Sequence, residues 1–233
     1  MSEPVGLYVT KSDYAYTRIR EGILRGEFEP GAVLQQAQLA KTIGISTTPL
    51  REAMRRLMTE GLVSLDAHRD ARVSDLTAEE ARDLLELRLS LDPLACSLAA
   101  QRRTKDDIRR MRETLSHCRP LLTNPSVEDL IAHRAFHQAI YEASHNDLLI
   151  STLDGLWDKA DRYRRLGLEV SRTQEERDQK DREHHALLEA VVRGDSDGAA
   201  TMMLQHISTS LGAKAATRLG GDEAAPTQLS PVD

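Results

Sequence analysis

Apolar residues in the first 60 positions recur three and four residues apart, a spacing that predicts helices with one buried face. The first helix is expected over 12–26, the second ends at Gly44, and the third follows a corner at 45–49 and runs to about Glu60. Glycine after the last helical turn is typical of a helix C-terminus, because it adopts left-handed backbone angles without strain. The pattern therefore predicts three short helices separated by tight corners.

Two short apolar runs follow, at 62–65 and 71–73, and they predict a hairpin around a polar loop. From Thr77 onward the helical spacing returns, with one long helix and then helices expected at about 104–121, 126–145, 147–167, 172–193 and 195–216. The sequence thus predicts a mostly α protein. Its parts are a helical unit with a small β-wing over 1–76, an antiparallel bundle of about six helices over 77–218, and a disordered tail over 219–233.

The composition supports packed helices, because aromatic residues make up only 3% of the chain and strands favour them. The formal net charge is -6. Residues 1–76 contain ten basic and ten acidic residues, so the acidic excess lies downstream. A wholly basic nucleic-acid binder is excluded, whereas a local basic patch is not. Cys96 and Cys118 form no CxxC pair, and no apolar run approaches the ~18 residues of a membrane span. We expect a cytoplasmic protein without a membrane partner.

Two helices joined by a glycine-containing corner and followed by a hairpin form the pattern of a winged helix-turn-helix, which binds double-stranded DNA. Arginine pairs with phosphate or with guanine edges, and a helix N-terminus can hold a phosphate. The candidate DNA contacts lie on the second helix of the motif, at its N-terminus and in the wing: Ser46, Thr47, Thr48, Arg51, Arg55, Arg56, Arg69 and Arg72. The helical arginines could equally form a solvated face paired with Glu52 and Glu60.

This segment resembles the GntR family of regulators. The matching residues, in family order, are Ile23, Gly26, Pro30, Gly31, Leu34, Leu39, Ala40, Gly44, Ser46, Thr48, Pro49, Arg51, Glu52, Ala53, Leu57, Glu60, Gly61, Leu62 and Val63. Two positions depart from the pattern: Thr47 stands where the family has arginine, and Asp70 stands where it has the wing-tip glycine. The resemblance implies that both positions contact DNA, so both changes should lower backbone affinity or alter base preference.

Four histidines stand out in the second half of the chain. His133 and His137 are four residues apart, so they share a helix face, and His184 and His206 lie on two later predicted helices. Imidazoles from three helices could meet at one point and bind a metal with open coordination positions. The spacing alone also fits ordinary surface or hydrogen-bonded histidines.

The half that contains them resembles the FCD effector domain of the FadR subgroup, over about 77–212. The resemblance rests on 88–92, 133–140, Asn146, 183–190 and 203–207. It implies a metal held by His133, His137, His184 and His206, although the family usually has aspartate at the first position. Three histidines and water are the alternative. Neutral nitrogen ligands suit Zn or Ni. A predicted count of six helices matches the VanR-like branch.

The resemblance also implies a small carboxylic acid beside the metal. Arg88 and Asn146 are the candidate effector contacts; alternatively, Arg88 pairs with Asp92 and Asn146 caps the following helix. The sequence thus predicts a repressor that binds an inverted-repeat operator as a homodimer. One alternative is a regulator whose metal is purely structural. A metal-dependent hydrolase is disfavoured, because Asp129 is the only carboxylate one turn from the predicted ligands, and no catalytic residue is predicted.

Overall fold

The computed structural model describes residues 10–65, 71–122, 125–168 and 171–220. The chain divides into two compact units, Met1–Leu76 and Thr77–Asp233. Of the tail predicted over 219–233, residues 221–233 lie outside the described residues, as does the wing loop at 66–70, whereas 219 and 220 are the last residues of a helix and not disordered. Among the described helices, none is both long and apolar enough to cross a membrane.

The first unit contains three helices, α1 (Lys11–Arg25), α2 (Gln36–Ile43) and α3 (Thr47–Thr59). The Thr10 side chain accepts a hydrogen bond from the Asp13 backbone N–H and so caps α1. Gly44 follows α2 with a φ of 78°, and its N–H bonds back to the Ala40 carbonyl, as predicted for the corner between α2 and α3. This corner turns the chain so that α3 begins with its first turn exposed.

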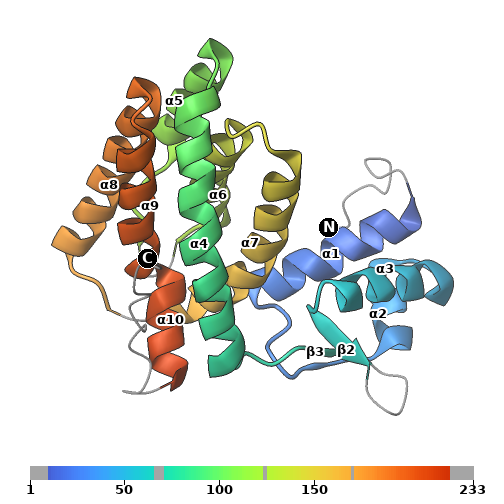
Figure 1. Ribbon diagram of the computed structural model, residues 1–233. Helices are drawn as coiled ribbons and strands as arrows, with labels where there is room; N and C mark the ends of the chain where they lie inside the picture. The colour runs from blue at the N-terminus through green and yellow to red at the C-terminus, as the bar shows by residue number, and fades with distance from the viewer. Residues whose placement is uncertain (1–9, 66–70, 123–124, 169–170, 221–233) are drawn as a thin grey trace, which may run out of the picture. The chain divides into compact units, whose positions relative to one another are not determined.

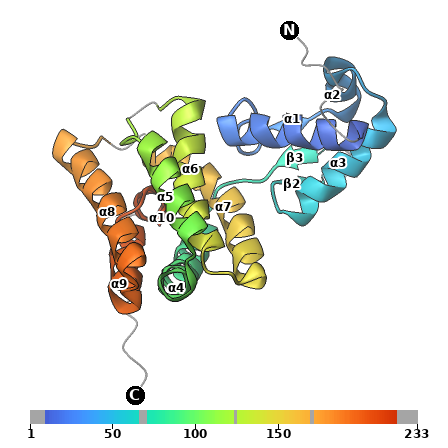
Figure 2. The same ribbon diagram turned by 90° about the horizontal axis from the view of Figure 1, so that it is seen from above.

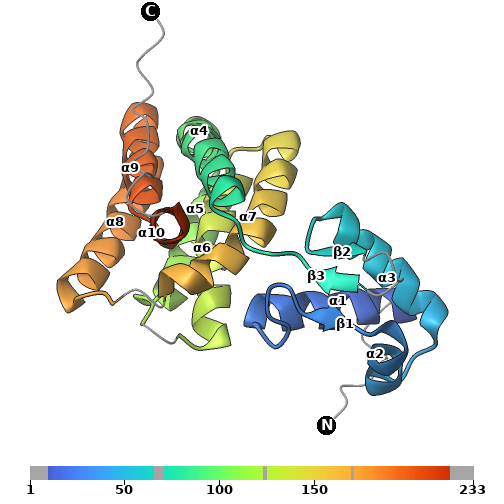
Figure 3. The same cartoon turned by 90° about the horizontal axis from the view of Figure 1, so that it is seen from below.

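A small antiparallel sheet completes this unit (Figure 3). Its strands are β1 (Val33–Leu34), β2 (Val63–Leu65) and β3 (Ala71–Val73), in the order β1-β3-β2. The hairpin of β2 and β3 was predicted, whereas β1 was not, because two residues carry no periodic signal. Buried apolar residues of α1, α3 and the sheet, among them Ile19, Leu50, Leu57, Leu62 and Val73, form one core.

The second unit is entirely helical over its described residues. Its helices are α4 (Ala78–Arg102), α5 (Lys105–His117), α6 (Val127–Glu142), α7 (Asp147–Leu168), α8 (Gln174–Arg193), α9 (Ser196–Ser208) and α10 (Leu211–Gly220). In Figure 1, α4 runs between α9 and α7, and it packs against both and against α10. Figure 2 shows α8 beside α9.

Side chains of α4 explain this central position. Ala95, Cys96, Ala99 and Ala100 are fully buried, and such small residues let neighbouring helices approach closely. Larger buried residues from the other helices, including Phe136, fill the remaining core. The core thus brings α6, α8 and α9 together around one interior region, where three predicted helices were expected to place their histidines.

The last predicted helix, at 195–216, is two helices in the structure. The chain leaves α9 after Ser208, and the Ser210 side chain accepts a hydrogen bond from the Ala213 N–H at the start of α10. The described part of this unit therefore has seven helices, α4 to α10, instead of about six. The helix count used for the VanR-like branch was wrong, and that count no longer supports the branch.

Candidate metal centre and nucleic-acid interface

Helix α3 presents its polar face from the first turn onward. Ser46 precedes the helix in an extended conformation, its side chain makes no capping hydrogen bond, and Thr47 and Thr48 are exposed beside it. Arg51 and Arg55 are exposed one turn apart, and within the described ranges their side chains make no hydrogen bond or ion pair. These groups are therefore available to a phosphate or a base edge.

Arg56 is in a different position from the other two arginines. Its guanidinium lies 2.7 Å from the Asp13 carboxylate and 3.9 Å from the ring centroid of Tyr16, both on α1. The Tyr16 hydroxyl in turn donates to Glu60 at 2.8 Å. Arg56 thus joins α1 to α3, and its predicted contact with DNA stays a prediction.

Of the two wing arginines, the structure describes only Arg72. The Arg72 side chain donates to the Gly31 carbonyl and so holds β3 against the turn before β1, while its predicted DNA contact stays a prediction. Arg69 and Asp70 lie outside the described residues, so their predicted roles stay predictions. The exposed arginines of the helix-turn-helix motif and wing in the described region are those of α3.

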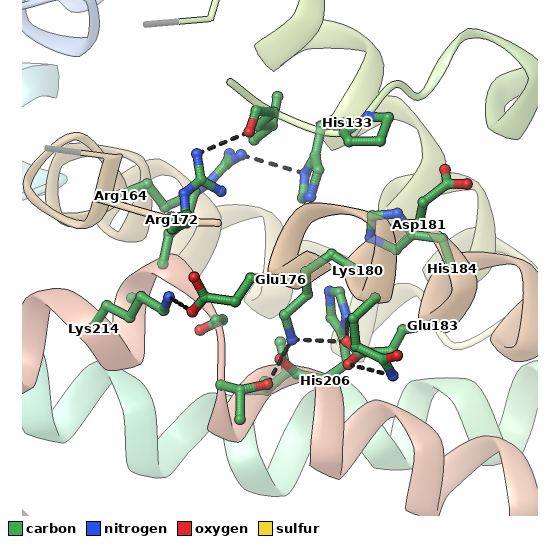
Figure 4. A pocket seen from close by; sticks show the side chains of 18 of the residues that line it. His133, Arg164, Arg172, Glu176, Lys180, Asp181, Glu183, His184, His206 and Lys214 are labelled. Carbon is green, nitrogen blue, oxygen red and sulfur yellow. Dashed lines mark hydrogen bonds and ion pairs between the residues drawn. The ribbon is translucent and has the colours of Figure 1, made fainter. Parts of the chain in front are cut away.

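In the second unit, the structure brings all four predicted histidines together. His133 and His137 come from α6, His184 from α8 and His206 from α9. One ring nitrogen of each lies within 4.8 Å of those of the others, a cluster that could hold a metal ion. His137, His184 and His206 are at most 5% exposed. Figure 4 shows His133, His184 and His206 at the inner wall of a pocket.

Several buried ring nitrogens in this cluster lack hydrogen-bond partners. Both nitrogens of His137 and Nε2 of His184 are buried and unpaired among the described residues. An unsatisfied buried polar atom costs about 1–3 kcal/mol, so three in one place require an explanation. A metal ion accepts lone pairs from such nitrogens at the distances that the cluster allows. The residues present therefore fit a divalent transition metal.

Neighbouring side chains fix two of the rings. His206 Nδ1 lies 2.8 Å from Glu183 Oε2, and His184 Nδ1 lies 3.8 Å from Cys118 Sγ. Burial raises the pKa of the Cys118 thiol to about 12, so it stays protonated at neutral pH. The carboxylate of Glu183 can only accept, so His206 donates from Nδ1 and its Nε2 is left for a metal, as metal-binding histidines commonly are. The Nε2 of His184 has no partner among the described residues, so it too can face a metal when Nδ1 donates to Cys118.

In His133 the contact with a neighbouring side chain places the ring proton on the other nitrogen, Nε2. Its Nδ1 lies 3.3 Å from Arg164 Nη2, and because arginine has only donors, this nitrogen must accept. The proton of the neutral ring then sits on Nε2, so neither nitrogen has a free lone pair while this contact lasts. The hydrogen bonds therefore favour the three-histidine alternative, in which His133 lies beside the metal ligands and positions Arg164.

Burial controls the protonation of the cluster. It lowers the pKa of His133, His137 and His184 well below the ordinary value of 6.5, and it lowers the pKa of His206 as well. Neighbouring imidazoles and arginines lower the pKa of His133 and His137 further. The rings are therefore neutral at physiological pH, which is the form that binds metals.

The cluster opens into a pocket of about 480 Å³. Its inner wall includes Trp157, with the guanidinium of Arg88 4.7 Å and that of Arg164 5.0 Å from the ring centroid. Arg88 also donates to Asp92 at 2.7 Å, and Asp92 accepts from the Tyr141 hydroxyl at 2.8 Å. Burial disfavours the charge of Arg88, but the Asp92 carboxylate holds its pKa above the ordinary value. Arg88 thus pairs with Asp92 and still lines the pocket.

Two residues bear on the predicted pocket wall. The Asn146 side-chain oxygen accepts from the Leu149 N–H at the start of α7 and Asn146 is not among the pocket-lining residues, which favours the capping alternative over the effector contact. Arg164 lines the pocket and was not predicted. It lies on α7, far in sequence from the histidines, beside Arg162 and Arg165. Which arginine of α7 lines the pocket depends on how this helix is rotated about its axis, so the sequence alone did not identify Arg164.

Two family models match the chain: the bacterial regulatory proteins of the gntR family over residues 11–73, and the FCD domain over residues 83–209. The uncharacterized HTH-type transcriptional regulator YdhC of Bacillus subtilis is 27% identical over 196 residues, covering 83% of this chain and 86% of the relative. The HTH-type transcriptional repressor GlaR of Escherichia coli is 28% identical over 204 residues, covering 83% and 91%.

A solved structure shows the same fold. That of E. coli McbR/YncC matches with a TM-score of 0.76 at 23% identity, over 89% of this chain and 98% of the other. The FCD match alone spans more than half of the chain, and these relatives are transcriptional regulators and not enzymes. The chain therefore belongs to the GntR family of DNA-binding transcriptional regulators and carries an FCD domain.

Proposed function

We propose that this regulator represses transcription from an inverted-repeat operator as a homodimer in the cytoplasm, and that a metal-bound carboxylic acid alters its operator affinity. Residues 1–76 would read the DNA, and residues 77–218 would dimerise and bind the metal and the acid. The observation that carries the sensing part is the group of buried, unpartnered ring nitrogens of His137 and His184 beside His206.

The metal would be held by His137, His184 and His206, with His133 able to join only by giving up Arg164. Neutral imidazoles favour zinc or nickel over magnesium or calcium, which prefer oxygen. When bound, the metal supplies open coordination positions for an oxygen ligand. Glu183 keeps the proton of His206 on Nδ1. The buried rings would keep water away from the side of the metal that faces the helical core.

The pocket beside the cluster supports a small-molecule ligand. Its volume lies within the range of about 300–1,000 Å³ typical of ligand sites. Arg88 and Arg164 are both at most 5% exposed and both face this space, so they favour an anion that also reaches the metal. A carboxylate meets both requirements.

DNA binding would rest on Arg51, Arg55 and the N-terminal turn of α3, the exposed groups without internal partners. Repression is supported by GlaR, which is described as a repressor. The acid would couple to DNA through a change in operator affinity of roughly 5–150-fold, the usual range for such coupling.

A binding assay on DNA from upstream of the regulator's own gene tests this proposal. Fluorescence anisotropy would be measured with zinc-loaded and chelated protein, with and without a panel of carboxylic acids. We expect salt-sensitive, sequence-specific binding that at least one acid weakens only in the loaded protein. If chelation lowers the melting temperature but no acid changes DNA binding, the metal is structural and the sensing proposal is wrong.

A further inference from the structure

The pocket wall carries more positive charge than a single carboxylate bound at the histidine cluster would neutralise. Besides Arg88 and Arg164, its wall includes Arg172, from the segment between α7 and α8. Figure 4 shows the side chains of Arg164 and Arg172 approaching the same region beside His133. Their charges oppose each other, and Arg164 contributes to a lowered pKa of Arg172, after burial and Arg177.

Arg172 is held in place by backbone atoms and not by an acid. Its Nη2 donates to the carbonyls of Leu121 at 2.8 Å and Leu122 at 3.0 Å. Its Nε is buried without a partner in the described part of the chain. No carboxylate hydrogen-bonds to Arg172 within those ranges. Burial, Arg177 and Arg164 leave the pKa of Arg172 below the ordinary value, although Glu176 attracts its charge from a distance.

Two acids of this region have other partners. Asp161 pairs with Arg164 at 2.6 Å and lies 3.4 Å from Arg134, whose main partner is Asp158 at 2.6 Å. Glu176 lies 2.9 Å from Lys214 and also accepts from the Thr173 N–H. Asp92, in contrast, forms its ion pair with Arg88 and with no other described arginine or lysine. Among Arg88, Arg164 and Arg172, the guanidinium without a paired carboxylate in the described region is therefore that of Arg172, which lies beside the ion pair of Arg164 with Asp161.

We infer that the pocket takes an acid with two anionic groups, one at the histidine cluster and a second, carboxylate or phosphate, between Arg164 and Arg172. Paired guanidinium groups bind such oxyanions through several charge-assisted hydrogen bonds. The pocket has room for both groups, since about 480 Å³ exceeds what a single carboxylate at the metal needs. This inference rests on the proposed function, because it specifies the ligand of the same sensing site.

Carbon-matched acids test the inference. Calorimetric titrations of zinc-loaded full-length protein would compare malonate, succinate, glutarate and adipate with propionate, butyrate, valerate and hexanoate. The pair 3-phosphoglycerate and glycerate distinguishes phosphate from carboxylate as the second group. We expect at least one doubly anionic acid to bind ten or more times tighter than its singly anionic match.

Substitutions then locate the second group. Arg172→Gln should remove the preference for the doubly anionic acid and leave the affinity of its singly anionic match unchanged, whereas Arg172→Lys should retain part of it. Arg182→Gln is the control, because Arg182 is exposed on the same pocket and its side chain bonds to Gln179. Circular dichroism and zinc binding verify that each variant is folded.

The outcomes separate this inference from the proposed function. Equal affinities for matched acids, or a preference that survives Arg172→Gln, would overturn the second anion subsite while the sensing proposal stands. If neither kind of acid binds the zinc-loaded protein, the sensing proposal itself fails, and this inference fails with it.

Discussion

Among single residues, Glu183 has a large part in orienting the histidine cluster, because it hydrogen-bonds to both His206 and Lys180. Its carboxylate accepts from His206 and, at 2.7 Å, from Lys180, whose ammonium also lies 3.2 Å from the His206 carbonyl. Burial would raise the pKa of Glu183, but these hydrogen bonds lower it to about 2. Glu183 is thus a carboxylate at any physiological pH and orients His206 with Nε2 facing the cluster.

Replacing this carboxylate should weaken metal binding without removing a ligand. We expect Glu183→Gln to lower zinc affinity about 10–100-fold, the usual effect of losing an outer carboxylate on a metal-binding histidine. Competition titration with a chromophoric chelator measures the change. Glu189→Gln, an exposed site on the same helix, is the matched control and should leave affinity unchanged. Equal affinities in the two variants would mean that Glu183 does not orient the ligand.

The buried imidazoles also make the stability of metal-free protein depend on pH. Their pKa values lie below 6.5 in the folded state, so below about pH 6.5 the unfolded chain binds more protons than the folded chain. Stability should therefore fall as the pH drops through 6.5, by up to about 1.4 kcal/mol per pH unit for each such histidine. Urea unfolding in chelator at pH 5.5, 6.5 and 7.5 measures this slope. A slope that His137→Ala leaves unchanged would contradict it.

The residues of the metal site could be predicted from sequence better than those of the ligand pocket. Histidine spacing on α6 and the resemblance of 183–190 and 203–207 to the FCD pattern identified all four histidines. The contact between His133 and Arg164 could not be predicted, because it depends on how α7 is rotated against α6. Nor could the sequence decide whether Arg88 pairs with Asp92 or lines the pocket, and the structure shows that it does both.

At the scale of elements, α3 divides its arginines between two tasks. Arg51 and Arg55 face solvent, while Arg56 packs against α1 through Asp13 and Tyr16. A helix of 13 residues places side chains on every side, so its sequence alone could not separate the three. The division predicts different consequences for the same substitution.

Arg51→Gln and Arg55→Gln should each weaken operator binding and reduce its salt dependence, with the slope falling by about one for every phosphate that the variant no longer binds. Neither should change the melting temperature. Arg56→Gln should lower the melting temperature with a smaller effect on the salt slope, because it disrupts the packing of α1 on α3. Anisotropy titrations at several salt concentrations, together with thermal melts, distinguish the three. An Arg56 variant with the largest reduction in salt slope would reverse the assignment.

The short helix α10 packs closely against α7 at Gly167. A Cβ built at Gly167 would come within 2.9 Å of the Leu211 carbonyl carbon, at the first residue of α10. Gly155 is also on α7, but a Cβ there would meet nothing within 4 Å. Only glycine therefore fits at the first of these positions.

Alanine at the two glycines should have opposite effects on stability. Gly167→Ala should cost about 1–3 kcal/mol through overpacking. Gly155→Ala should stabilise by up to about 1 kcal/mol, because alanine favours an exposed helix interior. Denaturant unfolding of both variants at equal metal content measures the difference. A neutral Gly167→Ala would show that α10 moves away at little cost.

Element boundaries were predictable where a capping residue or a glycine marked them. Gly26, Gly44 and Gly194 all follow helix ends with positive φ, close to the predicted ends. The division between α9 and α10 was missed, because apolar spacing continues through it and its main local signal is Ser210 at the start of α10. The strand β1 was missed because it exists only by pairing with β3.

For the whole molecule, the two matched families correspond to two separately folded units. The apolar core of the first unit holds α3 so that its N-terminal turn is exposed, together with the side chains of Arg51 and Arg55, which are unpaired among the described residues. The core of the second gathers α6, α8 and α9, so that histidines up to 73 positions apart in sequence meet at one point. DNA reading and the proposed ligand sensing would thus be built on different cores of one chain.

The central claim is that the histidines of α6, α8 and α9 bind a metal ion, and metal stoichiometry tests it most directly. Elemental analysis of the purified full chain after zinc loading and dialysis should give one metal per chain. His137→Ala or His184→Ala should reduce this to a small fraction, while His185→Ala should retain it, since His185 is exposed and its Nδ1 lies by the Asp181 carbonyl. Equal metal content in the His137 and His185 variants, or none in the unaltered chain, would contradict the claim.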